Sequence, residues 1–136
     1  MSELRHILLV EDNKADIRLM QEALKEHAPE IKISAVESGV EALEFLEKEE
    51  RPDLIILDLN LPKKDGREVL KEVKASNTLK TIPIIILTTS ESEHDIKIAY
   101  ELHANCYLAK PIDLDEFNRI VVLIQKFWLE TVRLCK

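Results

Sequence analysis

The sequence predicts an α/β fold, a doubly wound five-stranded parallel sheet with five helices. Four short runs are apolar over about four residues, a pattern typical of strands that are covered on both faces. A fifth run, 31–36, alternates between apolar and polar residues and is interpreted as an edge strand. The five expected strands are 7–10, 31–36, 54–57, 84–87 and 106–109. Strands and helices alternate strictly, as in doubly wound sheets.

Amphipathic segments separate the runs and predict the helices. The expected helices are 16–27, 40–49, 66–76, 92–102 and a last one that starts at Leu114. Pro29 follows the first helix, and Asp113 is a good N-cap for the last. The last helix runs about 20 residues without a glycine or proline, longer than the usual 11–12. We therefore expect an extended C-terminal helix.

Composition and charge narrow the class of protein. The 136 residues predict one domain without a separate output domain, and 46% apolar with 33% charged residues predict a soluble globular chain. The net charge of -7 disfavours nucleic acid as a partner. No apolar run is long enough to cross a membrane, and the N-terminus does not resemble a signal peptide. Two distant cysteines without a metal or redox spacing favour a cytoplasmic location.

Polar residues follow four of the five expected strands. Glu11 and Asp12 follow the first strand and Asp58 the third, while Thr88 follows the fourth and Lys110 the fifth. The carboxyl ends of parallel strands share one edge, where open α/β folds place their ligand site. Three clustered carboxylates repel one another and require a cation. Oxygen ligands of this kind suit Mg²⁺.

This set of groups predicts phosphoryl transfer. A hard metal, a lysine and a hydroxyl around one aspartate would let Asp58 act as a nucleophile that becomes an aspartyl phosphate. Each group alone has an ordinary interpretation: Asp58 as a turn former, Thr88 as a core-edge residue and Lys110 as a solvated side chain. All of those interpretations together would require several coincidences on one edge.

Four segments resemble the motifs of response-regulator receiver domains of the chemotaxis-regulator type. They are "ILLVEDN", "LIILDLNLPKKDG", "PIIILTTS" and "CYLAKP", and the resemblance covers essentially the whole chain. "LPKKDGREVL", "YELHANCYLAKP" and "FWLETV" look closer still to single-domain regulators that partner bacterial phytochromes. The resemblance implies a flavodoxin-like receiver fold and a signalling protein rather than an enzyme.

The same resemblance implies a phosphoacceptor and a metal site. Asp58 would receive a phosphoryl group from a phosphohistidine on a sensor histidine kinase, possibly a phytochrome-type kinase. Asp12 and Asp58 would bind Mg²⁺ directly. Glu11 would bind it through water, and Asn60 through its backbone carbonyl.

Four further residues take roles by resemblance. Thr88 and Lys110 would hold the phosphoryl oxygens, and Tyr107 would be the aromatic switch that follows Thr88. The bond between Lys110 and Pro111 is expected to be cis, which would aim the lysine inward. Phosphorylation would then change the packing of the face formed by the fourth helix, fifth strand and fifth helix.

The last helix carries more apolar residues than one core face can use. Those at core spacing are Phe117, Ile120, Val121, Ile124 and Trp128. Others have no obvious internal partner: Val122, Leu123, Phe127, Leu129 and Leu134. We expect a homodimer through the fourth helix, fifth strand and fifth helix, with Leu123, Phe127 and Trp128 as candidate contacts. The alternative is a tail that folds back onto its own domain.

Three other functions compete with this interpretation. An aspartyl-phosphate phosphatase would want a second acid two residues after the nucleophile, where this chain has Asn60. A nucleotide-binding domain would want a glycine-rich phosphate loop, but the chain has two glycines, Gly39 and Gly66. A pseudo-receiver that acts as a phosphorylation-independent scaffold stays open as the main alternative.

Overall fold

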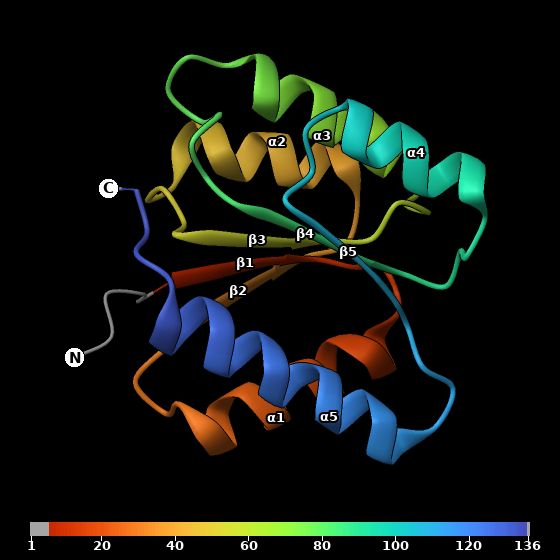
Figure 1. Cartoon of the computed structure of the whole chain (residues 1–136). Coiled ribbons are helices and arrows are strands. Elements are labelled where there is room, and N and C mark those ends of the chain that lie inside the picture. Colours follow the sequence, from red (N-terminus) through yellow and green to blue (C-terminus); the bar gives the residue numbers. More distant parts are fainter. Residues whose placement is uncertain (1–5, 136) are drawn as a thin grey trace.

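A single parallel sheet forms the centre of the molecule (Figure 1). The computed structural model describes residues 6–135, apart from the side chain of Leu129. The strands are β1 (His6–Val10), β2 (Lys32–Val36), β3 (Leu54–Leu57), β4 (Ile84–Thr88) and β5 (Cys106–Ala109). Their order across the sheet is β2-β1-β3-β4-β5, and all neighbouring pairs are parallel. The predicted α/β fold is confirmed, with β2 at one edge as expected.

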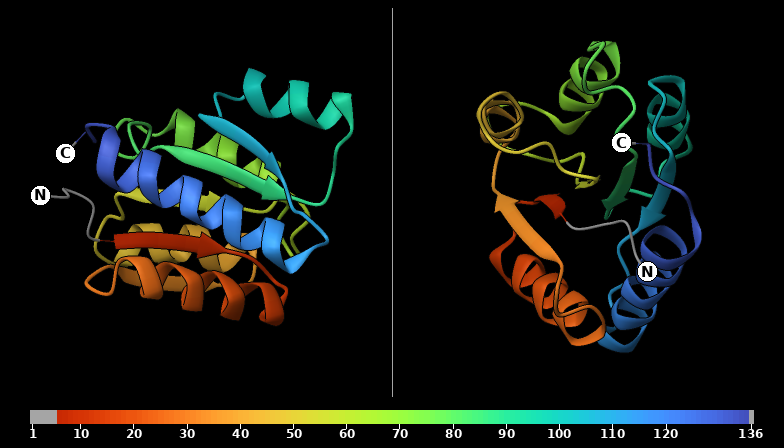
Figure 2. Two further views of the ribbon diagram at one scale, coloured as in Figure 1. Left: turned by 60° about the horizontal axis from the view of Figure 1, so that its bottom comes forward. Right: turned by 90° about the vertical axis from the view of Figure 1, so that its left-hand side faces the viewer.

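Helices cover both faces of the sheet. They are α1 (Lys14–His27), α2 (Gly39–Lys48), α3 (Gly66–Ala75), α4 (Glu93–Glu101) and α5 (Leu114–Ile124), followed by the π-helical η1 (Gln125–Thr131). α1 and α5 lie on one face, whereas α2, α3 and α4 lie on the other (Figure 2). Within residues 6–135, no helix is both long and apolar enough to cross a membrane.

Each of the five α-helices begins at a polar N-cap. The cap side chain accepts a backbone N–H from the first turn in every case: Asn13, Ser38, Asp65, Ser92 and Asp113. These bonds satisfy donors that have no partner within the helix. The caps place each helix start soon after a strand, so the residues between them stay at the carboxyl edge of the sheet.

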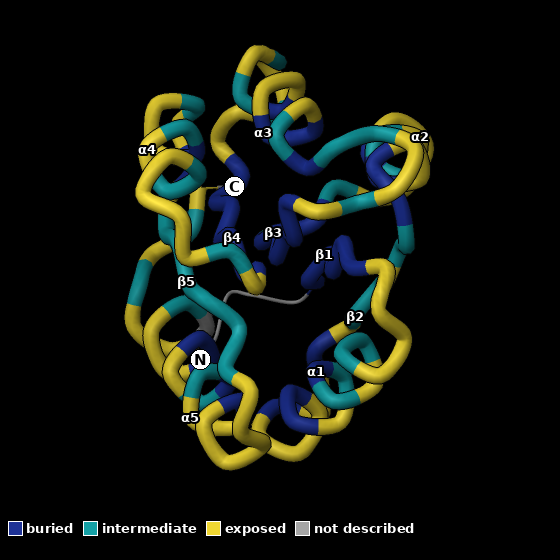
Figure 3. The backbone as a smooth tube through the Cα atoms, turned by 90° about the vertical axis from the view of Figure 1, so that its right-hand side faces the viewer, coloured by how far each residue is buried: buried dark blue, intermediate teal, exposed yellow. Residues whose placement is uncertain are grey.

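The sheet separates two hydrophobic clusters. The cluster on the α1 and α5 side includes Leu24 and Val121, and the cluster on the other side includes Leu70 and Val73. All residues of β1, β3 and β4 are buried, which Figure 3 shows as dark blue tube seen from the carboxyl edge. Three continuously apolar runs are therefore central strands, as predicted.

β5 was wrongly predicted to be covered on both faces. All four of its residues are half-buried because β5 forms the second edge of the sheet. α4, which packs beside it, buries a single residue, Ala99. Apolar sequence alone does not distinguish a central strand from an edge strand that is partly covered.

The predicted extended last helix is confirmed, but its winding changes partway along. Regular α-helix ends at Ile124, and the next residues form π-helical turns with bonds between positions five apart. Val132 N–H donates to the Phe127 carbonyl at 2.9 Å, and the Thr131 hydroxyl donates to the Lys126 carbonyl at 2.7 Å. This wider winding, with the residues after it, brings Trp128 and Leu134 against the α1/α5 cluster. Leu134 thus has an internal partner that the sequence did not indicate.

Candidate functional site

Three carboxylates meet at the carboxyl edge of the sheet. Glu11 and Asp12 follow β1, Asp58 follows the adjacent β3, and one oxygen of each lies within 4.8 Å of the others. Glu11 and Asp58 are buried, whereas Asp12 is exposed. Because β1 and β3 are neighbouring parallel strands of matching register, their ends bring the acids together. The predicted convergence is present.

Lys110 is the counter-ion of this cluster. It follows β5, its side chain is 7% exposed, and its Nζ is 3.0 Å from Asp58 Oδ2 and 3.0 Å from Asp16 Oδ2. It also pairs with Glu11. Burial acts to lower the pKa of Lys110, but the hydrogen bonds to Glu11, Asp16 and Asp58 outweigh it and hold that pKa above its ordinary value. The lysine is therefore a fixed positive charge.

One lysine does not balance the negative charge. Burial, helped by the charge of Asp58, raises the pKa of Glu11 to about 7, although Lys110 and the Asn13 N–H pull it the other way. A buried carboxylate of this kind is stabilised by a second cation. The oxygen-only donor set and the exposed side at Asp12 fit a hard divalent ion that keeps part of its water.

The turn after β3 orients Asp58. Asn60 N–H donates to Asp58 Oδ1 at 3.0 Å, so both carboxylate oxygens have a donor, the other being Lys110. Asn60 Nδ2 donates to Thr88 Oγ1 at 3.4 Å. Thr88 is fully buried at the end of β4, and its hydroxyl oxygen contacts Asn60 in the turn that follows Asp58.

The bond between Lys110 and Pro111 was wrongly predicted to be cis. None of the peptide bonds within residues 6–135 is cis. The trans form is favoured at bonds before proline by about 0.5–1 kcal/mol. Lys110 N–H donates to the Thr88 carbonyl at 2.7 Å, and Nζ reaches the carboxylates from that position.

Tyr107 lies on the face of the sheet covered by α2, α3 and α4. Its ring is half-buried against that cluster, and its hydroxyl donates to the Ser90 carbonyl at 2.9 Å. Burial raises the pKa of Tyr107, so the hydroxyl stays a donor at neutral pH. Tyr107 is two residues before Ala109, which pairs with Thr88 across the β4–β5 ladder.

Sequence reasoning missed four residues near the site. Asp16 contacts Lys110 from the first turn of α1. An acid at that position is common because it interacts favourably with the helix dipole. Arg67, Ser90 and Asp95 form a hydrogen-bonded network between α3 and α4. The Arg67–Asp95 contact spans 28 positions and the Asp16–Lys110 contact spans 94, so no local pattern could have indicated either contact.

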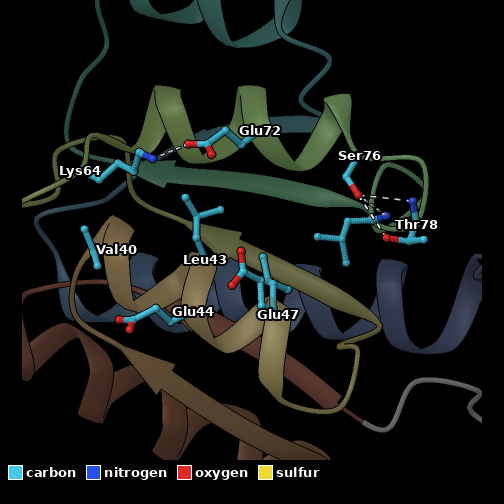
Figure 4. A pocket seen from close by; sticks show the side chains of 10 residues that line it. Val40, Leu43, Glu44, Glu47, Lys64, Glu72, Ser76 and Thr78 are labelled. Atoms are coloured by element: carbon cyan, nitrogen blue, oxygen red, sulfur yellow. Dashed lines mark hydrogen bonds and ion pairs between the residues drawn. The ribbon is translucent and has the colours of Figure 1, made fainter.

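A separate groove lies between α2 and α3. It has a volume of about 670 Å³, and Figure 4 shows Leu43 and Glu47 of α2 facing Glu72 of α3 across it. Lys64 at its rim pairs with Glu72 at 2.6 Å. The carboxylates and Lys110 lie at the carboxyl edge of the sheet and do not line this groove, so we place the candidate site at that edge.

Comparisons with known proteins agree with this geometry. The family model described as "Response regulator receiver domain" matches residues 7–122. The response regulator Rcp1 of Synechocystis sp. is 51% identical over 134 residues, which cover 94% of this chain and 91% of the relative.

Two solved structures are also similar. One is the phosphorylated cyanobacterial phytochrome response regulator RcpA, with a TM-score of 0.94 and 50% identity over 98% of this chain and 99% of that one. The other is the Mn²⁺-bound form of Rcp1, with a TM-score of 0.93 and 50% identity over 97% and 99%. The motifs, the fold, the acidic edge and these relatives lead to one conclusion: the chain belongs to the response regulator receiver domain family of two-component signalling proteins.

Proposed function

We propose that this receiver accepts a phosphoryl group on Asp58 from a sensor histidine kinase, with Mg²⁺, and signals to partner proteins by changing conformation. The observation that carries the proposal is the position of Asp58. It is buried between Lys110 and the Asn60 N–H and shares an edge with Glu11 and Asp12. A scaffold with no phosphoryl chemistry would not need this buried, charged arrangement.

The transfer would proceed by attack of an Asp58 carboxylate oxygen on phosphorus. The bond between phosphorus and the kinase histidine nitrogen breaks, and the imidazole, whose other ring nitrogen carries a proton, leaves as the neutral base with the electron pair of that bond. Glu11, Asp12, Asp58 and the Asn60 carbonyl would hold Mg²⁺, which supplies positive charge to the phosphoryl oxygens. Lys110 would move from the carboxylate to a phosphoryl oxygen.

Thr88 and Tyr107 would transmit the change. The phosphoryl group adds about -1.5 to -2 charge and new acceptor oxygens. The Thr88 hydroxyl, now beside Asn60, would turn and donate to one of them. That movement would free space near the end of β4 and let Tyr107 turn inward, which alters the α4–β5–α5 face.

The relatives support a kinase of the phytochrome type. RcpA is named as a phosphorylated phytochrome response regulator, and Rcp1 has been solved with a bound divalent ion. We infer that this chain has a sensor kinase of that class as its donor and works in the cytoplasm. The kinase would be tested directly by phosphotransfer from a purified phytochrome-type kinase.

The decisive test is the intact mass after incubation with acetyl phosphate and Mg²⁺. We expect one phosphoryl adduct in the parent, none in Asp58→Asn, and none when EDTA removes the metal. No adduct from acetyl phosphate or from the kinase, together with no binding of beryllofluoride, would favour the scaffold alternative.

The metal site has a separate test. Mg²⁺ at about a hundred times its dissociation constant should stabilise the folded protein by about 2.7 kcal/mol. Asp12→Asn should reduce this shift, whereas Asp115→Asn at the exposed start of α5 should not. Equal shifts in thermal unfolding for both variants would argue against the assigned ligands.

We also propose a homodimer through the α4–β5–α5 face. Leu123 and Phe127 are 50% and 52% exposed and line one apolar surface with Trp128 and residues of β5. Trp128 packs partly against the α1/α5 cluster, and its ring contacts the Phe127 ring edge-on with 5.4 Å between the ring centroids. Trp128 would therefore fix the position of Phe127 at the dimer contact.

Light scattering tests the dimer. Leu123→Ser with Phe127→Ser should give a monomeric mass at micromolar concentration where the parent is dimeric. Val40→Ser, which removes an exposed apolar side chain from α2, is the matched control. A monomeric parent with and without phosphorylation would exclude the dimer.

A further inference from the structure

Arg67 joins the start of α3 to α4. Its Nη1 is 3.0 Å from both oxygens of Asp65, the N-cap of α3, and its Nη2 donates to Asp95 Oδ1 at 2.7 Å. The side chains of Arg67 and Asp95 are 28% and 19% exposed. By contrast, the side chains of the surface pair Arg119 and Glu116 are 61% and 52% exposed. The Arg67–Asp95 pair is thus much better sheltered from water.

Asp95 carries the network onward to Tyr107. Its second oxygen, Oδ2, accepts the Ser90 hydroxyl at 2.6 Å, and the Ser90 carbonyl accepts the Tyr107 hydroxyl at 2.9 Å. Ser90 and Arg67 hold the pKa of Asp95 below its ordinary value, so it stays an acceptor. Four residues from α3, the β4–α4 loop, α4 and β5 are therefore connected by hydrogen bonds that pass through the side chain and the backbone carbonyl of Ser90.

Two parts of this chain of bonds follow site residues closely in sequence. Asp65, the N-cap of α3, ends the loop that follows Asp58, and Gly66 N–H donates to the Leu59 carbonyl at 2.9 Å. Ser90 is two residues after Thr88. A movement of Thr88 toward a phosphoryl group would pull on a loop that Asp95 and Arg67 hold.

We propose that Arg67 and Asp95 are positioning residues that hold the β4–α4 loop and Tyr107 in the present arrangement and thereby oppose the phosphorylated one. This inference rests on the proposed function. For Tyr107 to turn inward, its hydroxyl must leave the Ser90 carbonyl or Ser90 must move with it. The first route loses the Tyr107 hydrogen bond, and the second pulls on Asp95, which both Ser90 and Arg67 contact. An interaction present in one state alone shifts the equilibrium toward that state.

The test is a beryllofluoride titration of the Mg²⁺-loaded protein, with beryllofluoride as the phosphoryl analogue. Arg67→Gln and Asp95→Asn should each bind it about fivefold more tightly than the parent, a typical size for coupling between sites. Mg²⁺ affinity measured without beryllofluoride should not change, because neither residue bonds to the carboxylates of the proposed metal site. The double variant should gain no more than either single change, since both act through one bond.

Two further measurements separate positioning from general loosening. Arg119→Gln removes a surface ion pair and should leave beryllofluoride affinity unchanged, and Arg67→Lys, which keeps the charge, should lie nearer the parent. Without the analogue, amide hydrogens of residues 89–95 should exchange faster in Arg67→Gln and Asp95→Asn.

Unchanged or weaker beryllofluoride binding in both variants, with a parent that binds, would overturn the inference. A parent that binds no beryllofluoride and forms no phosphoryl adduct would instead overturn the proposed function. In that case amide exchange decides the positioning role by itself: unchanged exchange in both variants would reject it. If a neutral variant does not fold, the titration is decided by Arg67→Lys, which must then bind more tightly than the parent.

Discussion

Glu11 has a proton affinity that links metal binding to pH. Its side chain is buried beside Asp58, and its pKa is raised to about 7, from an ordinary value of 4.5. A hard cation binds the carboxylate and not the carboxylic acid. Below about pH 7, Mg²⁺ must therefore displace a proton from Glu11, so its affinity for the protein should fall as the solution becomes more acidic.

The same shift predicts how the metal-free protein responds to pH. Between about pH 4.5 and pH 7 the folded state keeps the Glu11 proton while the unfolded state releases it, so the free energy of unfolding falls as pH rises. Glu11→Gln should reduce this fall. Urea unfolding in EDTA at the two ends of this range measures the difference. Glu26→Gln, an exposed change on α1, is the control, and equal slopes in parent and Glu11→Gln would contradict the prediction.

The residues of the site differ in how far sequence could predict them. Asp58 and Lys110 could be placed because each follows an apolar run, and the ends of parallel strands coincide in space. Asp16 could not, because its contact with Lys110 spans 94 positions. The conformation of the Lys110–Pro111 bond followed from resemblance alone and was wrong, since local sequence leaves the two forms close in energy.

Lys74 connects three elements at the opposite edge of the sheet. Its Nζ donates to the carbonyls of Lys80 and Ile82, at 3.1 and 3.0 Å, and to Asn105 Oδ1 at 3.0 Å. It thereby ties the end of α3 to the segments entering β4 and β5. Burial lowers the pKa of Lys74, a cost that these three acceptors offset.

Removing that connection should destabilise the fold. Lys74→Met leaves the partly buried Ile82 carbonyl and two exposed acceptors without their charged donor and should reduce the free energy of unfolding by about 1–3 kcal/mol. Lys71→Met, an exposed change on the same helix, should stay within about 0.5 kcal/mol of the parent. The comparison is made by urea unfolding, and equal losses in both variants would reject this role.

α2 and the loop before α3 touch at Gly39. A Cβ there would lie 2.1 Å from the Lys64 carbonyl oxygen and 2.7 Å from the Lys64 Cβ. Backbone atoms cannot yield as a flexible side chain can. Gly39 is thus selected by close approach, although alanine would favour the helix by about 1 kcal/mol.

Gly39→Ala should therefore reduce stability despite its better helix propensity. We expect a loss of about 1–3 kcal/mol in the free energy of unfolding, because the loop must move to accept the methyl group. Val40→Ala changes the next, exposed position and is the matched control. A more stable Gly39→Ala would mean that the loop yields without cost.

Elements could be predicted where local signals are strong. The N-cap at Asp113 marked the start of the last helix at Leu114. The change to π-helical winding after Ile124 could not be predicted, because nothing in that stretch breaks a helix. Within this stretch, Trp128 packs against the α1/α5 cluster, a tertiary contact that the local sequence does not specify.

At the scale of the whole molecule, the sheet acts as a partition. Val121 belongs to the α1/α5 cluster, whereas Val69 and Val73 belong to the cluster on the other side. All three are buried, with exposure of at most 1%. The two clusters share the strands but not their side chains, because successive residues of a strand point to opposite faces.

The effects of core substitutions on the free energy of unfolding should therefore add when they lie on opposite faces of the sheet, and interact when they lie on the same face. Val121→Ala and Val73→Ala should each reduce the free energy of unfolding, and the double variant should lose their sum to within about 0.5 kcal/mol. Val69→Ala with Val73→Ala, four residues apart on α3, should deviate from additivity. Urea unfolding of the two sets decides it, and a large coupling across the sheet would contradict the partition. Where additivity holds, each face can drift in sequence without compensation from the other.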